Sequence, residues 1–295
     1  MKRISILLAL LLVITMIGCA EPRLTNDQTG ETPAQQQETP AQQQETPEPS
    51  TEVPEPAAPN AESVYIDDFT VQTVDGGTFT LSEAQKDHEL VLINLFATWC
   101  GPCAREFPAL QEAWSMSSDR VAVIALSIEP DDTLEALKEY ADSMGLTFPM
   151  GREEGTDLSR FVTVGIPTTI LVDQTGRIAA LEVGAKATTQ EFLDFFDGFT
   201  GSNYDPNKCT YTVYAYDTED NMVAGVVVNF CTETSCTPVT TNEEGVATFS
   251  GAPGRYHVQI VKWPDGRSLY YESDAEFYTE PYAQSFWIPF TIENE

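Results

Sequence analysis

Short apolar runs alternate with amphipathic segments through the middle of the chain. Leu90 to Phe96 and Val121 to Ser127 are nearly uninterrupted apolar runs, as expected for strands in a sheet covered on both faces. Residues 102–116 and 133–144 place apolar side chains at helical spacing. Hairpins are predicted at residues 69–80 and 170–183, a short helix at 157–161 and a closing helix at 189–199. This order predicts an α/β domain with a mixed sheet and helices on both faces.

The apolar period changes to two after residue 203. Alternating positions recur in four short segments, separated by turns rich in Asn, Asp, Pro and Gly. These segments begin near Tyr211, Val226, Val246 and Tyr256. Short strands at this spacing indicate an all-β sandwich, and the Gly- and Pro-containing stretch 201–206 is interpreted as a linker. We therefore expect two folded domains, 61–203 and 204–295.

Residues 1–60 lack the pattern of a folded domain. Basic residues at the start precede an apolar run from Ile4 to Ile17, which is short for a membrane span and indicates an export signal. The end of this run resembles a bacterial lipoprotein signal of residues 1–18, in which Cys19 becomes the lipidated first residue. An ordinary secretory signal with an incidental cysteine is the alternative. Either reading predicts an extracytoplasmic location, where disulfides persist.

Residues 19–60 are rich in Pro, Gln and Glu. The segment Glu31 to Gln37 recurs as Glu38 to Gln44, and few of the surrounding residues are large and apolar. A segment of this composition cannot bury a core, which predicts a disordered tether. The net charge of −31 argues against nucleic acid as a partner, because little positive charge is available to neutralise phosphates. It also disfavours adhesion to anionic lipid, so a lipid on Cys19 would provide the membrane anchor.

The stretch Thr98-Trp99-Cys100-Gly101-Pro102-Cys103 carries the clearest chemistry. It lies between a predicted strand and a predicted helix, where the helix N-terminus favours a thiolate at Cys100. Cys103 follows one turn later and can resolve a mixed disulfide, so no cofactor is needed. A structural bridge or half of a zinc site are the alternatives. A zinc site needs a second ligand pair, and His88 and His257 stand apart from any such pair, so no metal is expected.

A second motif, Val164-Gly165-Ile166-Pro167-Thr168-Thr169, precedes another apolar run. An X–Pro bond directly before a strand is a natural place for a cis peptide. Because Pro167 has no N–H, a substrate chain could approach the dithiol closely at this point. The alternative is an ordinary proline at the entry of a strand.

Together the two motifs resemble those of extracytoplasmic thiol-disulfide oxidoreductases of the TlpA/ResA type, which have the thioredoxin fold. The matching residues are Asn94 to Pro108 and Gly165 to Thr169, within a segment from about Ser63 to Phe199. The resemblance implies that Cys100 attacks a partner disulfide, Cys103 resolves it and Pro167 is a cis proline. It also implies that Trp99, Ile166 and Thr168 contact the substrate.

Three further positions refine this resemblance. Asn94 stands where cytoplasmic thioredoxins have a buried aspartate, and Glu106 stands where the similar extracytoplasmic proteins carry a glutamate. Glu106 lies one helical turn after Cys103, so we expect it to tune the thiol pKa values and to relay protons. The alternative is a solvated helix glutamate. A thiol peroxidase would be similar in fold but has a threonine where this chain has Ala97.

The C-terminal domain resembles another group over residues 208–262, the prealbumin-like or Cna-B-like β-sandwich repeats. The matching segments are 220–228 and 241–249, and the resemblance implies the fold but little about function. The domain contains Cys209, Cys231 and Cys236. Pairing of the first two strands around Asp220 would place Cys209 opposite Cys231. A structural disulfide between Cys231 and Cys236 is slightly favoured, which leaves Cys209 free or reactive, and the alternative is an electron relay between these three cysteines and Cys100–Cys103.

These observations lead to one functional hypothesis and one alternative. The hypothesis is a membrane-anchored extracytoplasmic thiol-disulfide oxidoreductase that reduces disulfide-containing partner proteins through Cys100 and Cys103. A membrane thiol transporter would re-reduce it, and oxidised apocytochrome c or reductases that repair methionine sulfoxide are plausible targets. The alternative is a cell-surface interaction protein in which the β-sandwich is the main functional module.

Overall fold

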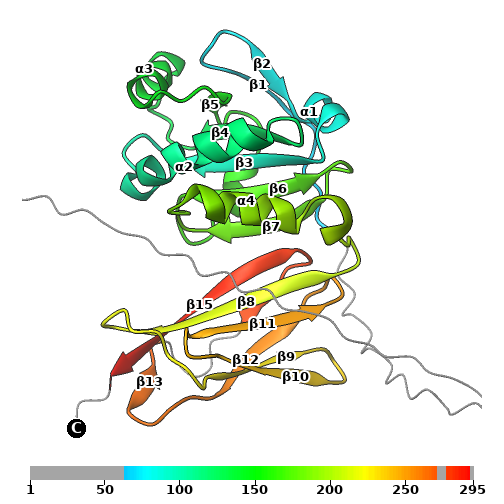
Figure 1. The fold of residues 1–295 in the computed structure, drawn as a ribbon, viewed down its shortest axis with the longest axis vertical. Helices are drawn as coiled ribbons and strands as arrows, with labels where there is room; N and C mark the ends of the chain where they lie inside the picture. The colour runs from blue at the N-terminus through cyan, green and yellow to red at the C-terminus, as the bar shows by residue number, and fades with distance from the viewer. Residues whose placement is uncertain (1–62, 271–276, 293–295) are drawn as a thin grey trace, which may run out of the picture. The chain divides into compact units, whose positions relative to one another are not determined.

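The computed structural model describes residues 63–270 and 277–292 (Figure 1). Residues 63–203 are called the α/β half here, and the described residues from 204 onward are called the β half. The α/β half contains β1 (Thr70–Gln72), β2 (Thr78–Thr80), α1 (Leu81–Asp87), β3 (Leu90–Phe96), α2 (Gly101–Ser117), β4 (Val121–Ser127), α3 (Leu134–Met144), β5 (Met150–Arg152), η1 (Leu158–Phe161), β6 (Thr168–Asp173), β7 (Ile178–Val183), α4 (Thr189–Gly198) and η2 (Gly201–Asn203). None of the helices in the described ranges is long and apolar enough to span a membrane.

The sheet of the α/β half has the order β7-β6-β3-β4-β5. Strand β3 is parallel to β4 and antiparallel to β6, so the sheet is mixed. Every residue of β3 and β4 is buried, as the continuous apolar runs predict for strands covered on both faces. This arrangement confirms the predicted fold class for this half of the chain.

Alternate residues of the central strands enter two separate cores. Leu92 and Phe96 of β3 pack in one core with Phe107 of α2 and Phe192 of α4. On the opposite face, the intervening β3 residues pack against Phe79 and other apolar side chains from the β1–β2 hairpin, α1 and η1. Figure 1 shows α2 and α4 side by side across the strands. Because β3 is fixed from both faces, the loop that follows it has a rigid base.

The β half contains β8 (Cys209–Asp217), β9 (Val227–Cys231), β10 (Cys236–Thr240), β11 (Val246–Gly251), β12 (His257–Lys262), β13 (Arg267–Leu269), β14 (Phe277–Tyr278) and β15 (Ala283–Ile292). One sheet has the order β10-β9-β12-β14, and β11-β8-β15 form the other. Side chains from both sheets share one core that includes Tyr211, Phe230 and Phe249. The two sheets thus form the predicted sandwich.

Strand β15 also pairs with β7 of the α/β half. The pairing is parallel and joins Ala283 to Ala180 and Gln284 to Leu181. Farther along, β15 runs parallel to β8 over seven pairs, from Gln284 to Phe290. One sheet therefore runs from β11 through β15 into the strands of the α/β half. The sequence pattern predicts neither β15 nor this connection.

The segment that follows α4 is more structured than a linker. It contains η2, and the hydroxyl of Tyr204 donates to Asp173 at 2.9 Å. The guanidinium of Arg177 donates to the Tyr204 hydroxyl at 2.8 Å and also to the carbonyl of Pro206. Arg177 is buried in this network. The interpretation of residues 201–206 as a plain linker is therefore corrected, because their backbone and side chains bond to the end of β6 and the start of β7.

Candidate active site

The two cysteines of the first motif form a disulfide at the start of α2. Cys100 is the N-cap residue of this helix, and Pro102 follows within the first turn, where a missing N–H is tolerated. The backbone N–H of Cys103 donates to the Cys100 sulfur at 3.2 Å. Cys100 is 3% exposed and Cys103 is fully buried. Cys100 is thus the less buried of the two residues, and its sulfur accepts a hydrogen bond of the kind that stabilises a thiolate.

The loop between β3 and α2 is held by a buried carboxylate. Asp132 accepts hydrogen bonds from the backbone N–H of Thr98 at 3.1 Å and from the Thr98 hydroxyl at 2.6 Å. The hydroxyl of Ser127, at the end of β4, donates to the same carboxylate. In addition, the backbone N–H of Cys100 donates to the carbonyl of Ala97 at 3.0 Å. These contacts fix the backbone from Ala97 to Cys100.

Trp99 lies on the surface directly beside the disulfide. Its side chain is 68% exposed, which is unusual for tryptophan. The indole N–H donates to the carboxylate of Glu129 at 2.8 Å, so the exposed ring has a fixed orientation. The motif in the sequence identifies Trp99, whereas Glu129 and Asp132 belong to no motif. Their position just after the apolar run of β4 is the only signal in the sequence that could have identified them.

The second motif places its loop against Cys100. The carbonyl oxygen of Ile166 lies 3.7 Å from the Cys100 sulfur, and the Ile166–Pro167 peptide bond is cis. Pro167 is buried, and its carbonyl accepts a hydrogen bond from the N–H of Gly184 at 2.9 Å. Thr168 is also buried, and its hydroxyl donates to the carbonyl of Gly165 at 2.7 Å. The two motifs, about 65 residues apart in the sequence, thus meet at one site.

Glu106 is fully buried in α2, so its alternative interpretation as a solvated helix residue is wrong. One carboxylate oxygen accepts from the Asn94 side-chain amide at 2.8 Å, and the other accepts from the backbone N–H of Lys186 at 3.1 Å. Burial raises the pKa of Glu106 to about 7, although both hydrogen bonds and the Lys186 charge act in the opposite direction. A carboxyl group with this pKa can both accept and release a proton near neutral pH.

Asn94 supports Glu106 from the facing strand. Its amide nitrogen donates to Glu106 and also approaches the hydroxyl of Thr169 at 3.2 Å. Its carbonyl oxygen is buried and has no hydrogen-bond partner within residues 63–270 and 277–292. This free acceptor could receive a hydrogen bond from a protonated Glu106 carboxyl after a small rotation. Asn94 can therefore donate a hydrogen bond to the ionised Glu106 carboxylate and accept one from the protonated Glu106 carboxyl.

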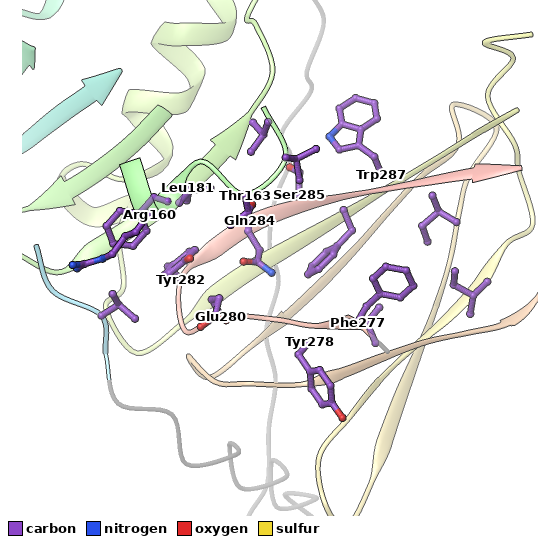
Figure 2. Close-up of a pocket in the computed structure, with 18 of the residues that line it drawn as sticks. Arg160, Thr163, Leu181, Phe277, Tyr278, Glu280, Tyr282, Gln284, Ser285 and Trp287 are labelled. Carbon is purple, nitrogen blue, oxygen red and sulfur yellow. The ribbon is translucent and has the colours of Figure 1, made fainter. Parts of the chain in front are cut away.

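A cavity of about 810 Å³ begins at the loop that leads to Ile166. Thr163 and Val164 of this loop line it together with residues of β7, and the β half contributes Tyr282, the first half of β15 and residues of β12. Figure 2 shows Arg160, Thr163 and Leu181 from the α/β half near Tyr282 and Gln284 from the β half. Val164 is 86% exposed. The loop whose Ile166 lies beside Cys100 thus also presents an exposed apolar side chain, Val164, to this cavity.

The three cysteines of the β half separate into a disulfide and a free thiol. Cys231 and Cys236 are bonded to each other, and Cys209 is free and buried. Burial raises the pKa of the Cys209 thiol to about 11, which disfavours the reactive thiolate. Cys209 does not lie opposite Cys231, because β8 pairs with β11 and β15 and belongs to the other sheet. A short antiparallel turn does form around Asp220, where Tyr216 bridges Met222, but the pairing does not continue into β9, so the predicted placement of Cys209 opposite Cys231 is wrong.

Comparisons with known proteins agree with this geometry. A family model described as the AhpC/TSA family matches residues 65–181. The thioredoxin-like protein YneN of Bacillus subtilis (strain 168) is 31% identical over 130 residues, which cover 43% of this chain and 75% of that protein. The thiol-disulfide oxidoreductase ResA of Bacillus cereus is 29% identical over 124 residues, or 41% of this chain and 69% of that protein.

Among solved structures, a thiol:disulfide interchange protein from Chlorobium tepidum TLS is similar, with 24% identity and a TM-score of 0.41. The match covers 47% of this chain and 97% of that one. The family model ends at residue 181, so the β half lies outside it. With its Cys100–Cys103 disulfide and its YneN and ResA relatives, the chain belongs to the ResA-like thiol-disulfide oxidoreductases of the AhpC/TSA family.

Proposed function

We propose that this protein is a membrane-anchored extracytoplasmic reductant of protein disulfides. The observation that carries the proposal is the Cys100–Cys103 pair at the start of α2, with Ile166 beside Cys100 and the protonatable Glu106 buried in the same helix. A buried carboxyl group with a pKa near neutrality is suited to move the proton that each exchange step requires.

In the proposed reaction, the Cys100 thiolate attacks one sulfur of a partner disulfide. The partner S–S bond breaks, a mixed disulfide forms with Cys100, and the released partner thiolate takes up a proton. Cys103 then loses its proton to Glu106 and attacks the Cys100 sulfur. The Cys100–Cys103 bond forms, the mixed disulfide breaks, and the second partner thiol leaves protonated. Two electrons and two protons pass to the partner protein.

The substrate contacts in this proposal come from the surface around Cys100. The exposed ring of Trp99 and the backbone of Ile166 flank the reactive sulfur, and Pro167 offers no N–H that would compete for the substrate. Thr168 contributes indirectly, because its buried hydroxyl bonds to Gly165 and holds the loop. An extended substrate segment would continue over Val164 into the apolar cavity. The continuity between loop and cavity favours substrates with apolar residues near the disulfide.

The location and direction of electron flow follow from the N-terminal sequence and the family resemblance. A signal of residues 1–18 with lipidation at Cys19, and a tether of residues 19–60, would place the folded domains outside the membrane; these segments lie outside the described residues. The redox domain would comprise residues 61–203, and a prealbumin-like or Cna-B-like sandwich residues 204–295. A membrane thiol transporter would supply the electrons, and the partners would be disulfide-containing extracytoplasmic proteins.

Trapping of mixed disulfides tests this proposal. A Cys103→Ser variant cannot complete the second step, so it should accumulate covalent complexes with its partners in cells. Mass spectrometry of these complexes identifies the partner cysteines, and a Cys100→Ser/Cys103→Ser variant is the matched control. If the single variant forms no more complexes than the control, reduction of partner disulfides is not its role.

A second candidate function is binding of a surface partner by the β half. It is favoured by the cavity, because β12, β15 and Tyr282 contribute much of its wall. Under this function Cys100→Ser would leave partner binding intact, whereas under the main proposal it removes productive capture. A pull-down with the Cys100→Ser variant under reducing conditions distinguishes the two.

A further inference from the structure

A row of side chains crosses the outer face of the β10-β9-β12 sheet. Cys236 lies directly opposite Cys231, and Cys231 lies directly opposite His257 on the next strand. Opposed residues in a sheet project from the same face. The neighbouring pair Phe230 and Val258 is buried in the sandwich core, so the cysteine row faces outward. Cys236 is an exposed residue whereas Cys231 is buried, so Cys236 is the more accessible half of the bridge.

The strand ladder closes this hairpin with or without the disulfide. Strands β9 and β10 pair without interruption from Cys231–Cys236 to Val227–Thr240. The turn adds a backbone hydrogen bond from Thr232 to Ser235 at 2.7 Å. The bridge spans a sequence separation of 5, and a loop this short removes little entropy from the unfolded chain. Opening the bridge therefore leaves the fold of the hairpin in place.

The environment of Cys231 is prepared for a released sulfur. The side-chain oxygen of Gln259 lies 3.6 Å from the Cys231 sulfur, within reach of a thiol S–H. The amide nitrogen of Gln259 lies 3.2 Å from Nδ1 of His257. Cys231 thus has an acceptor for its proton and an imidazole one residue beyond it. The buried thiol of Cys209 has its own pKa raised and lies in the other sheet.

We propose that Cys231–Cys236 is a second thiol–disulfide exchange site, and that the Cys100–Cys103 dithiol of a second copy of this chain reduces it. The Cys100 thiolate of the donor copy attacks the exposed Cys236 sulfur and forms a mixed disulfide. The Cys231–Cys236 bond breaks, the Cys231 thiolate takes up a proton from solvent, and the resulting thiol donates a hydrogen bond to Gln259. Donor Cys103 then attacks donor Cys100, and Cys236 leaves as a thiol. One disulfide is reduced while the other forms, so electrons and protons balance.

The position of β10 fits this donor. It lies at the edge of its sheet, and although Pro238 has no N–H to donate, the outer backbone groups near Cys236 can pair with a short extended segment. The Ile166 backbone lies beside Cys100 and offers such a segment next to the attacking sulfur. Strand β10, which is extended and carries the exposed Cys236, is therefore a suitable partner for the Ile166 segment beside Cys100. This inference rests on the disulfide-reducing activity proposed above.

Two full-length variants separate donor from acceptor. The acceptor is Cys100→Ser/Cys103→Ser with the Cys231–Cys236 bridge oxidised, and the donor is reduced Cys231→Ser/Cys236→Ser. After mixing, acid quenching and thiol alkylation, mass spectrometry gives the fraction of reduced Cys231 and Cys236. The expected result is reduction at least ten times faster than with a donor that also carries Cys100→Ser. A donor with Cys103→Ser should instead give a mixed disulfide at Cys236.

The donor is assayed in parallel on the disulfides of insulin. If insulin is reduced and the Cys231–Cys236 bridge reacts no faster than with the inactive donor, this inference fails and the proposed activity stands. If neither is reduced, both fail. A mixed disulfide that forms through Cys231 instead of Cys236 contradicts the proposed direction of attack.

Gln259 serves as a positioning residue in this step, and its substitution provides a sharper test. In the acceptor, Gln259→Leu removes the hydrogen-bond partner of the released Cys231 thiol, so the fraction of reduced Cys231 and Cys236 at equilibrium with the donor should fall several-fold. The circular dichroism spectrum of the oxidised acceptor should stay unchanged, which a general disturbance of the hairpin would not produce. The matched control is Thr240→Val, an exposed position of β10 on the same face of the sheet as Cys236. An equal effect of both substitutions contradicts the role of Gln259.

Discussion

The two disulfides of this protein lie in contrasting environments. Cys100–Cys103 closes the first turn of a helix, where Cys103 donates a backbone hydrogen bond to the Cys100 sulfur and a buried carboxyl group lies one turn away. Cys231–Cys236 joins two strands that are already paired, and its nearest polar partner is a neutral amide. The sulfur chemistry is the same in both. What differs is the machinery that stabilises a thiolate and moves a proton, and this machinery suits the first pair to rapid thiol–disulfide exchange.

Removal of one sulfur from each disulfide should separate the two sites most strongly. Cys100→Ser deletes the nucleophile, and we expect a loss of roughly a thousandfold or more in the rate of insulin reduction. Cys231→Ser should change this rate less than twofold, because it leaves the donor site intact. Turbidity during insulin reduction measures both. Comparable losses in the two variants would show that the sites do not have the assigned roles.

The stability of the protein should report the proton on Glu106. Because burial raises its pKa from an ordinary value of 4.5 to about 7 on folding, the folded state holds more protons between these values. The free energy of unfolding therefore falls as pH rises through this window, by about 3 kcal/mol from this group. Glu106→Gln should lack this loss. Urea unfolding of the oxidised proteins at pH 4.5 and pH 8 measures it, and parallel pH profiles would contradict the assignment.

Glu106 should also set the pace of exchange. A group that moves a proton contributes about a hundredfold or more to rate, so Glu106→Gln should slow insulin reduction by roughly a hundredfold near pH 7. The rate of insulin reduction by the Glu106→Gln variant should also depend less on pH between 5 and 9 than the rate of the natural protein. Glu135→Gln, an exposed residue in the first turn of α3, is the control. A similar pH profile for the natural protein and Glu106→Gln would rule out the relay.

Deletion of the second bridge should have a moderate effect on stability. The double variant Cys231→Ser/Cys236→Ser loses a cross-link over a short loop, and chain entropy alone gives a decrease of about 2 kcal/mol in the free energy of unfolding. Guanidinium unfolding followed by circular dichroism measures the change. A variant that fails to fold would show that the bridge is indispensable and would remove the distinction between the two disulfides.

The smallest expected effect concerns the surface beside Cys100. Val164→Asp places a charge between the redox loop and the cavity, and it should weaken reduction of a protein substrate several-fold. Reduction of a small aromatic disulfide, which cannot reach the cavity, should stay unchanged. Thr156→Asp in the preceding loop serves as control. Equal losses with both substrates would mean that Val164 supports the loop and does not contact the substrate.

Local signals in the sequence predict the centre of the fold and most of the candidate site. The apolar runs of β3 and β4, the Trp-Cys-Gly-Pro-Cys stretch and the proline motif each lie within a few residues, and the structure brings the last two together. The burial of Glu106 is less visible, because a glutamate in an amphipathic helix usually faces water. Asn94 and the Lys186 backbone satisfy its oxygens from distant segments.

The missed features depend on long-range contacts. Strand β15 contains Pro289 and the exposed Trp287, and its alternation of buried and exposed residues is weak, so its pairing with β7 and β8 determines its position. The predicted linker is ordered by Arg177, whose partners Tyr204 and Pro206 are separated from it by more than 25 positions. Likewise, Cys209 cannot pair with Cys231 because β8 and β9 belong to different sheets, and the spacing of the cysteines in the sequence did not decide between the two pairings.

The pairing of β15 with β7 also bears on how the chain reaches its folded state. Ala283 follows its partner Ala180 by roughly a hundred positions, so this contact forms only after a long loop has closed. Until then β7 is an open edge whose backbone groups can pair with any extended chain. The two pairs that β15 forms with β7 cover this edge, and a chain shortened before β15 would leave the backbone groups of Ala180 and Leu181 open to pairing with another strand.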